Sequence, residues 1–260
     1  MKFVTDIFGE EDANITFFGV DCPDSVREVS QLVEPFDVTD GRNYLENVRI
    51  FDSGDVGMDG VDEKVREIIA KGKFPLMYAK EHTASFHAMT AMPKGTKLIV
   101  FDAHSDLKDE YEGSKDSHAC WLRRWCEVGD CKDIVIIGFR SGDEDELEFA
   151  KGNRINYFTA REMKENPGKV SEFLRSFVKG AQFYISLDMD AFDPSVVPAV
   201  KYPEPDGLSY GDFWKFIEPL KQGKLMGMDF NELRPFSENR ISEFFAIKIV
   251  FRILGELSVQ

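Results

Sequence analysis

The chain has 260 residues, of which 43% are hydrophobic and 30% charged, so it is long enough for one large globular α/β domain with a sizeable core. Its formal net charge of −15 argues against nucleic acid and anionic membranes as partners and suits a small cationic molecule. No apolar run approaches the roughly 20 residues of a membrane span, and the N-terminal residues lack a signal-peptide layout. We therefore expect a single domain over residues 1–260 in the cytoplasm.

Eight apolar segments, many rich in β-branched or aromatic residues, predict strands. In chain order they are Ile15–Val20, Val48–Asp52, Phe74–Ala79, Lys97–Phe101, Ile134–Phe139, Ile155–Phe158, Phe183–Leu187 and Leu225–Phe230. Amphipathic or capped segments between them predict helices, namely Pro23–Val29, Asp62–Gly72, Ala119–Glu127, Glu144–Lys151, Lys169–Lys179, Ser209–Gly223 and Ile241–Leu257. This alternation is typical of a parallel sheet with helices on both faces.

The strand Lys97–Phe101 runs directly into three potential metal ligands, Asp102, His104 and Asp106. In an extended backbone alternate side chains share a face, so this spacing points two carboxylates and one imidazole in the same direction. Three converging donors would supply most of the ligands of a metal site.

A second acidic pair, Asp188 and Asp190, stands where the strand Phe183–Leu187 ends. His82 follows the strand Phe74–Ala79, although a lone histidine is more often structural. Either acidic motif alone could be a loop that caps the next helix. Because ligands of open α/β sheets bind at the carboxyl ends of strands, two such motifs and a histidine at a third strand end favour a metal site.

Two histidines and four aspartates are too many donors for one ion and suit two. Four carboxylates balance the charge of two divalent ions, and oxygen-rich ligation favours Mn²⁺, although Zn²⁺, Ni²⁺ or Co²⁺ could bind as tightly in vitro. Two ions about 3.5 Å apart can share one water and lower its pKa towards neutrality, so the expected reaction class is metal-assisted hydrolysis.

The cysteines predict no second site. Their spacings match no common metal or redox pattern, so we interpret them as free cytosolic thiols without a function; they are Cys22, Cys120, Cys126 and Cys131.

Four motifs resemble the ureohydrolase family of arginases and agmatinases. They are D-A-H-S-D at Asp102–Asp106, D-E-Y-E-G-S-K-D-S-H at Asp109–His118, S-L-D-M-D-A-F-D-P at Ser186–Pro194 and D-F-N-E-L-R-P at Asp229–Pro235. The resemblance implies a three-layer α/β/α domain with an eight-stranded parallel sheet. It also implies a binuclear Mn²⁺ centre that hydrolyses a guanidino group to urea and an amine, in a homotrimer or homohexamer.

The resemblance also assigns roles to individual residues. One ion is expected to be held by His82, Asp102, Asp106 and Asp188, and the other by His104, Asp102, Asp188 and Asp190. His118 falls on the family's proton-shuttling histidine, and Glu232 on the carboxylate that holds the guanidinium. The alternatives are a helix-capping role for His118 and a surface carboxylate for Glu232. The departing amine must leave protonated, and Asp106 is the expected first carrier of that proton.

Departures from the family pattern lie near the pocket mouth and bear on the substrate. Ala79–Glu81 replaces the usual Gly-Gly-Asp, Lys201–Tyr202 replaces Gly-Thr, and the N-terminal substrate-side segment is reduced to little more than Pro23–Glu28. The loop after Asp106 carries more acidic than basic residues, which are Asp109, Glu110, Glu112 and Asp116 against Lys108 and Lys115. An acidic rim would repel the α-carboxylate of arginine, although Lys201 could favour an anionic tail.

The leading hypothesis is an agmatinase, an enzyme of polyamine synthesis that converts agmatine to putrescine and urea. A second hypothesis is a hydrolase of another guanidino compound, such as arginine or guanidinobutyrate. A third is a ureohydrolase-like binding or regulatory protein without turnover. The presence of all six expected ligands and both accessory residues favours an enzyme.

Overall fold

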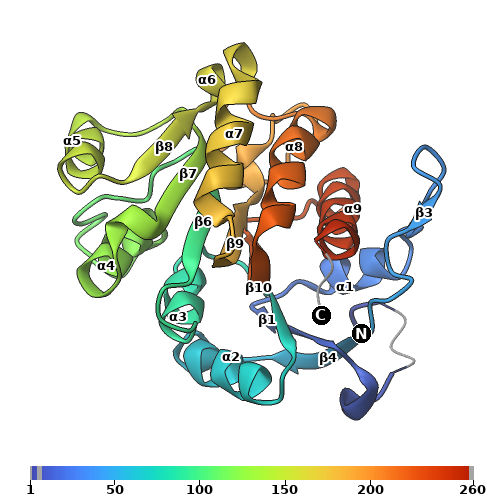
Figure 1. The fold of residues 1–260 in the computed structure, drawn as a ribbon. Helices are drawn as coiled ribbons and strands as arrows, with labels where there is room; N and C mark the ends of the chain where they lie inside the picture. Colours follow the sequence, from blue (N-terminus) through green and yellow to red (C-terminus); the bar gives the residue numbers. More distant parts are fainter. Residues whose placement is uncertain (1, 5–7, 258–260) are drawn as a thin grey trace.

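The computed structural model describes residues 2–4 and 8–257 and is built on an eight-stranded sheet (Figure 1). Its strands pair in parallel in the order β4-β1-β5-β10-β9-β6-β7-β8, which confirms the predicted sheet. The strands are β1 (Ile15–Val20), β4 (Ile50–Asp55), β5 (Phe74–Ala79), β6 (Lys97–Phe101), β7 (Ile134–Phe139), β8 (Asn156–Thr159), β9 (Gln182–Asp188) and β10 (Lys224–Asn231). A separate antiparallel pair joins β2 (Phe36–Asp37) to β3 (Arg42–Asn43).

Helices cover both faces of the sheet, as predicted. They are α1 (Asp24–Ser30), α2 (Val61–Ala70), α3 (Ala84–Thr90), α4 (Trp121–Val128), α5 (Glu144–Gly152), α6 (Ala160–Glu165), α7 (Pro167–Val178), α8 (Tyr210–Ile217) and α9 (Ile241–Glu256). The helices α3 and α6 were not predicted from the sequence. Within the described part of the chain, no helix combines the length and apolar character needed to cross a membrane.

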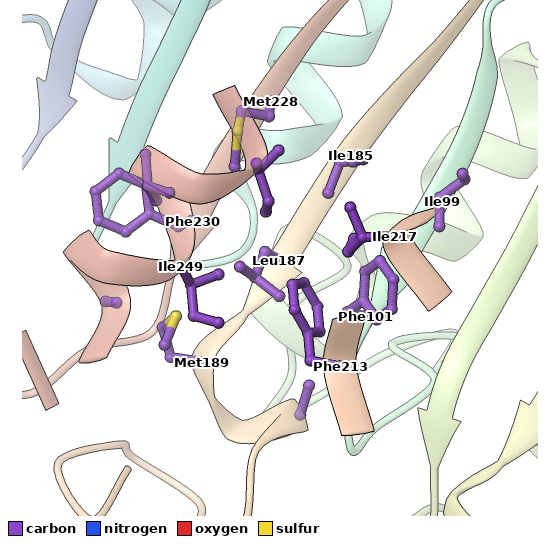
Figure 2. Packing of buried hydrophobic residues seen from close by; sticks show 14 of the residues in the cluster. Ile99, Phe101, Ile185, Leu187, Met189, Phe213, Ile217, Met228, Phe230 and Ile249 are labelled. Atoms are coloured by element: carbon purple, nitrogen blue, oxygen red, sulfur yellow. The ribbon is translucent and has the colours of Figure 1, made fainter. Parts of the chain in front are cut away.

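The central strands bury side chains on both faces, so each contributes to two cores. In β6, Ile99 and Phe101 belong to the core under α1 and α7–α9, whereas Leu98 and Val100 belong to the core under α2–α5. Figure 2 shows the first core, where β6, β9 and β10 pack against α8 and α9. Continuous apolar strands of this kind hold their carboxyl ends in fixed positions at one edge of the sheet.

A buried ion pair fastens the edge strand β4 to α1. Arg27 Nε lies 2.9 Å from Asp52 Oδ2, and Arg27 Nη2 lies 2.5 Å from Asp55 Oδ1. Asp52 is fully buried, and its Oδ2 also accepts a hydrogen bond from the Phe3 backbone N–H at 2.7 Å. The pair therefore joins the N-terminal segment, the first helix and the edge of the sheet.

Replacing Arg27 should destabilise the protein strongly, because Asp52 would be left buried without its cation. Arg27→Met is expected to lower the free energy of unfolding by about 3–5 kcal/mol, measured by urea denaturation. The matched control is Arg161→Met, which removes an exposed ion pair with Glu165 and should change stability little. Equal stability of the two variants would contradict the structural role of the buried pair.

Candidate active site

The predicted metal donors and Glu232 lie at or just beyond the carboxyl ends of four strands that are neighbours in the sheet, β5, β10, β9 and β6 (Figure 1). His82 follows β5, Glu232 follows β10, Asp188 ends β9 and Asp102 follows β6. Because neighbouring parallel strands end at the same edge, these side chains meet although they are far apart in the sequence.

One group of donors surrounds the imidazole of His82. Its Nδ1 lies 3.1 Å from Asp102 Oδ2, 3.0 Å from Asp106 Oδ2 and 3.3 Å from Asp188 Oδ2. All four side chains are buried. Three buried carboxylates therefore surround one nitrogen.

A second group surrounds His104. Its Nδ1 lies 2.9 Å from Asp190 Oδ2 and 3.6 Å from Asp102 Oδ1. Asp102 thus directs one oxygen towards each histidine. The structure brings all six predicted donors together, with Asp102 between the two groups.

Short local hydrogen bonds fix the carboxylates after each strand. Asp102 Oδ1 accepts from the His104 N–H at 2.6 Å, and Asp188 Oδ1 accepts from the Asp190 N–H at 2.7 Å. Asp190 Oδ1 accepts from the Ala103 N–H at 3.0 Å, which links the two motifs. Asp188 caps a short 3₁₀ helix in this way, so the helix-capping alternative describes part of its role.

Burial and mutual repulsion make this cluster attractive to a cation. Burial raises the pKa of Asp188 well above its usual range, and the charges of Asp190 and Asp102 raise it further. Burial also raises the pKa of Asp106 to about 6, with Asp102 as the next cause. Burial alone would lower the pKa of His82, but the neighbouring carboxylates raise it well above its ordinary value. The raised pKa of His82, which its carboxylate neighbours cause, indicates that a positive charge is favourable at this position.

Two buried atoms support a metal site in this cluster. Within the described residues, His82 Nδ1 and Asp102 Oδ2 have no hydrogen-bond partner although both are buried. The donor atoms fall into two compact groups, His82 with Asp102 and Asp106, and Asp102 with His104 and Asp190. Unsatisfied nitrogen and oxygen donors in two groups suit two divalent ions.

A chain of hydrogen bonds orients His82 and was not predicted from the sequence. His82 Nε2 lies 2.9 Å from Ser186 Oγ, and that hydroxyl donates to Asp229 Oδ1 at 2.8 Å. With Nε2 as the donor, Nδ1 presents its lone pair to the carboxylates, as a metal-ligating histidine requires.

Two further side chains fix the loop that carries Asp106. Trp121 Nε1 donates to Asp106 Oδ2 at 2.7 Å. Glu146 Oε1 accepts from Ser105 Oγ at 2.5 Å and from the Leu107 N–H at 3.2 Å. The spacing of Asp143 and Glu146 is a capping box, which the sequence shows, but no sequence signal pointed to Trp121.

A cavity of about 260 Å³ opens over the donors. His118, Tyr111, Tyr202, Glu204 and Glu232 contribute to its wall. The side chain of Glu232 is only 6% exposed, so the surface-carboxylate alternative is wrong.

The carboxylate of Glu232 is held from two sides. Its Oε1 accepts from the His82 N–H at 2.8 Å, and its Oε2 lies 3.0 Å from Arg234 Nη2. Burial raises the pKa of Glu232 to about 7, although the charge of Arg234 acts in the opposite direction. Because burial disfavours the charged form of Glu232, a second cation beside it would stabilise the carboxylate.

His118 stands on the cavity wall among aromatic side chains. Its ring stacks on Tyr202 with centroids 5.6 Å apart and meets the edge of Tyr111 at 5.4 Å. Burial and the charge of Lys201 lower the pKa of His118, so its imidazole can accept a proton at neutral pH. Ser117, whose hydroxyl accepts from the Ala119 N–H, caps the short helix that begins at His118.

Comparison with known proteins decides the family. The model of the Arginase family matches residues 19–255. The chain belongs to the arginase family.

Similar proteins agree with this assignment. The N(1)-aminopropylagmatine ureohydrolase of Synechocystis sp. is 30% identical over 251 residues, which cover 90% of this chain and 81% of that protein. The agmatinase of Pyrococcus horikoshii is 31% identical over 248 residues, which cover 90% and 83%. The crystal structure of agmatine ureohydrolase of Thermoplasma volcanium superposes with a TM-score of 0.87 at 30% identity and covers 98% of this chain and 94% of that chain. The predicted membership of the ureohydrolase family is therefore confirmed, and the protein is a hydrolase of guanidino compounds.

The acidic rim at the cavity edge is formed by residues other than those that the sequence predicted. A turn between Tyr111 and Ser114 folds the loop back, so Glu112 and Asp116 line a neighbouring hollow instead of the cavity. Asp109 pairs with Arg124 at 2.9 Å. The cavity edge instead carries the exposed Asp143 and the half-buried Glu204.

The shared position of Asp102 predicts different effects for two aspartates. Asp102→Asn should lose metal from both groups of donors, whereas Asp190→Asn should chiefly weaken the group around His104. Elemental analysis of purified protein gives the metal content, and Asp116→Asn is the matched control outside the cavity. Two ions retained in Asp102→Asn would show that Asp102 does not bridge.

Proposed function

We propose that this arginase-family ureohydrolase converts agmatine to putrescine and urea in polyamine synthesis. The observation that carries the proposal is the position of Glu232, a buried carboxylate in the same cavity as the two groups of metal donors. Agmatine and its N(1)-aminopropyl derivative appear in the names of similar proteins, which supports a substrate of this class.

Six side chains would hold two Mn²⁺ ions: His82, Asp102, Asp106 and Asp188 for one, and His104, Asp102, Asp188 and Asp190 for the other. The buried unpartnered atoms of His82 and Asp102 support this arrangement. Bound divalent ions would lower the pKa of a water molecule and so allow attack on a guanidinium carbon at neutral pH.

Glu232 would fix the substrate. A guanidinium stays protonated at any working pH, so it must be oriented by a carboxylate beside the metal donors. Glu232 Oε1 accepts a hydrogen bond from the His82 backbone N–H, which fixes the carboxylate that would bind the substrate relative to the metal donors.

Asp106 and His118 would move the proton to the departing amine. Asp106 faces the cavity beside His82, and His118 lies on the wall with a lowered pKa. Asp106 would take the proton first, and His118 would exchange it with solvent.

The cavity edge favours a cationic tail over an anionic one. Its lysine, Lys108, is paired with Asp143 and lies 3.3 Å from Glu146. Lys201 lies 3.7 Å from Glu81, so its charge is offset as well. Glu204 remains at the edge, with its Oε1 3.9 Å from His104 Nε2.

The environment and assembly of the protein are also proposals. All four cysteine thiols are free, which suits a reducing cytoplasm. Exposed Leu32, Ile241 and Phe244 line an apolar hollow of about 750 Å³, which supports a homo-oligomer such as the trimer or hexamer implied by the family.

Urea release with added Mn²⁺ tests the substrate. We expect kcat/KM for agmatine to exceed that for arginine by about tenfold or more, because the α-carboxylate of arginine would meet paired lysines and acidic neighbours. The matched compound is guanidinobutyrate, which replaces the terminal amine with a carboxylate, and N(1)-aminopropylagmatine tests a longer cationic tail. Comparable rates on arginine and agmatine would refute the preference.

Variants of Glu232 and His118 separate substrate fixing from proton transfer. Glu232→Gln keeps size and hydrogen bonding but removes the charge, so kcat/KM should fall on the order of 10³-fold. His118→Ala should lose about 10²-fold, and external imidazole should restore part of the rate. Both variants should retain two ions.

The control for the histidine is His87→Ala in α3, which lies outside the cavity. Rescue of Glu232→Gln by imidazole, or a full rate in His118→Ala without it, would show that the two roles are assigned wrongly.

A further inference from the structure

Glu232 has a cationic neighbour that carries the same chemical group as the proposed substrate. Arg234 Nη2 lies 3.0 Å from Glu232 Oε2 and 2.7 Å from Glu81 Oε1. One guanidinium nitrogen is therefore divided between two carboxylates. An arginine is charged at any working pH, so Arg234 is a permanent internal competitor for Glu232.

Arg234 is fixed at this place by the backbone. Its Nη1 donates to the carbonyl oxygen of Lys80 and, at 3.1 Å, to that of Leu233. These bonds join the segments that follow β5 and β10. They also occupy Nη1 and keep the guanidinium within reach of both carboxylates, so that Nη2 is the nitrogen shared between Glu81 and Glu232.

Glu81 supplies the balancing charge. Besides Arg234, it faces His118 Nδ1 at 3.5 Å and Lys201 Nζ at 3.7 Å through its Oε2. The cations Arg234 and Lys201 thus meet two carboxylates, Glu81 and Glu232. Without Glu81, Glu232 alone would face Arg234.

We propose that Glu81 is a positioning residue that draws Arg234 away from full pairing with Glu232 and so leaves Glu232 able to bind a substrate guanidinium. The inference rests on the proposed function of Glu232 as the guanidinium-binding carboxylate. Glu81 touches no reacting atom in this account, because it acts through Arg234.

The test is second-site suppression. Glu81→Gln should raise KM for the guanidino substrate by about tenfold, with a smaller change in kcat, because the freed Arg234 pairs with Glu232. The double variant Glu81→Gln/Arg234→Met should bring KM back to within about threefold of Arg234→Met alone, because the competitor is then absent. A merely structural role of Glu81 would give no such recovery.

Glu112→Gln is the matched control, since Glu112 lines the neighbouring hollow with Glu81. It should leave KM unchanged, and every variant should retain the metal content of the wild type. An unchanged KM in Glu81→Gln, or a double variant no better than Glu81→Gln, would overturn the inference.

The comparison does not depend on agmatine. It uses whichever guanidino compound the wild type hydrolyses fastest, so a wrong substrate leaves the differences among variants intact. Calorimetric binding of guanidinium chloride to the metal-loaded proteins gives the same comparison without turnover. Weaker binding in Glu81→Gln that Arg234→Met restores supports the inference, and equal binding in all variants contradicts it.

Discussion

Repulsion among four buried carboxylates is the constraint on which the site depends. Asp102, Asp106, Asp188 and Asp190 are all nearly closed to solvent and share one space with two imidazoles. Such a cluster is costly unless cations balance it. The two continuous cores on either side of β5, β10, β9 and β6 keep the strand ends in place against this repulsion. The packing of the two cores therefore maintains the carboxylate cluster that would attract metal ions.

The metal donors and the cavity wall are held in place by different kinds of contact. The metal donors themselves are held by backbone N–H groups, Ser186 and Trp121, so they are in position before a substrate arrives. The cavity wall, in contrast, carries the stacked rings of His118 and Tyr202, and behind it Glu81 lies 3.5 Å from His118 Nδ1. We expect arginase-family members with different substrates to differ in this wall and to share the metal donors that support hydrolysis.

Much of this architecture follows from local patterns. The eight strands followed from local signals, and Asp102, His104 and Asp106 were predicted as ligands from their spacing after an apolar strand. The chain bends at Ala103 and His104 and Asp106 has a φ of 52°, so these side chains converge through the shape of the loop and not through the alternation of an extended strand. The order of the strands in the sheet did not follow, because it depends on how the helices pack. That order is what places the end of β10, and with it Glu232, beside His82.

The features that the sequence did not predict depend on long-range contacts or weak local signals. Arg234 pairs with Glu81, which is 153 positions away in the sequence, and Trp121 in α4 donates to Asp106 in the loop after β6. The short helix α3 has small residues such as Ala84 and Ala88 on its buried face and therefore lacks a clear apolar stripe. The loop after Asp106 was expected to place an acidic rim at the pocket mouth, but its direction is set by a turn between Tyr111 and Ser114 that residue charges do not reveal.

Anomalous diffraction at the manganese edge from crystals of the Mn²⁺-loaded protein tests the central claim most directly. The account predicts two peaks, one among His82, Asp102, Asp106 and Asp188 and one among His104, Asp102, Asp188 and Asp190. A single peak, or peaks outside these two groups of side chains, would contradict it.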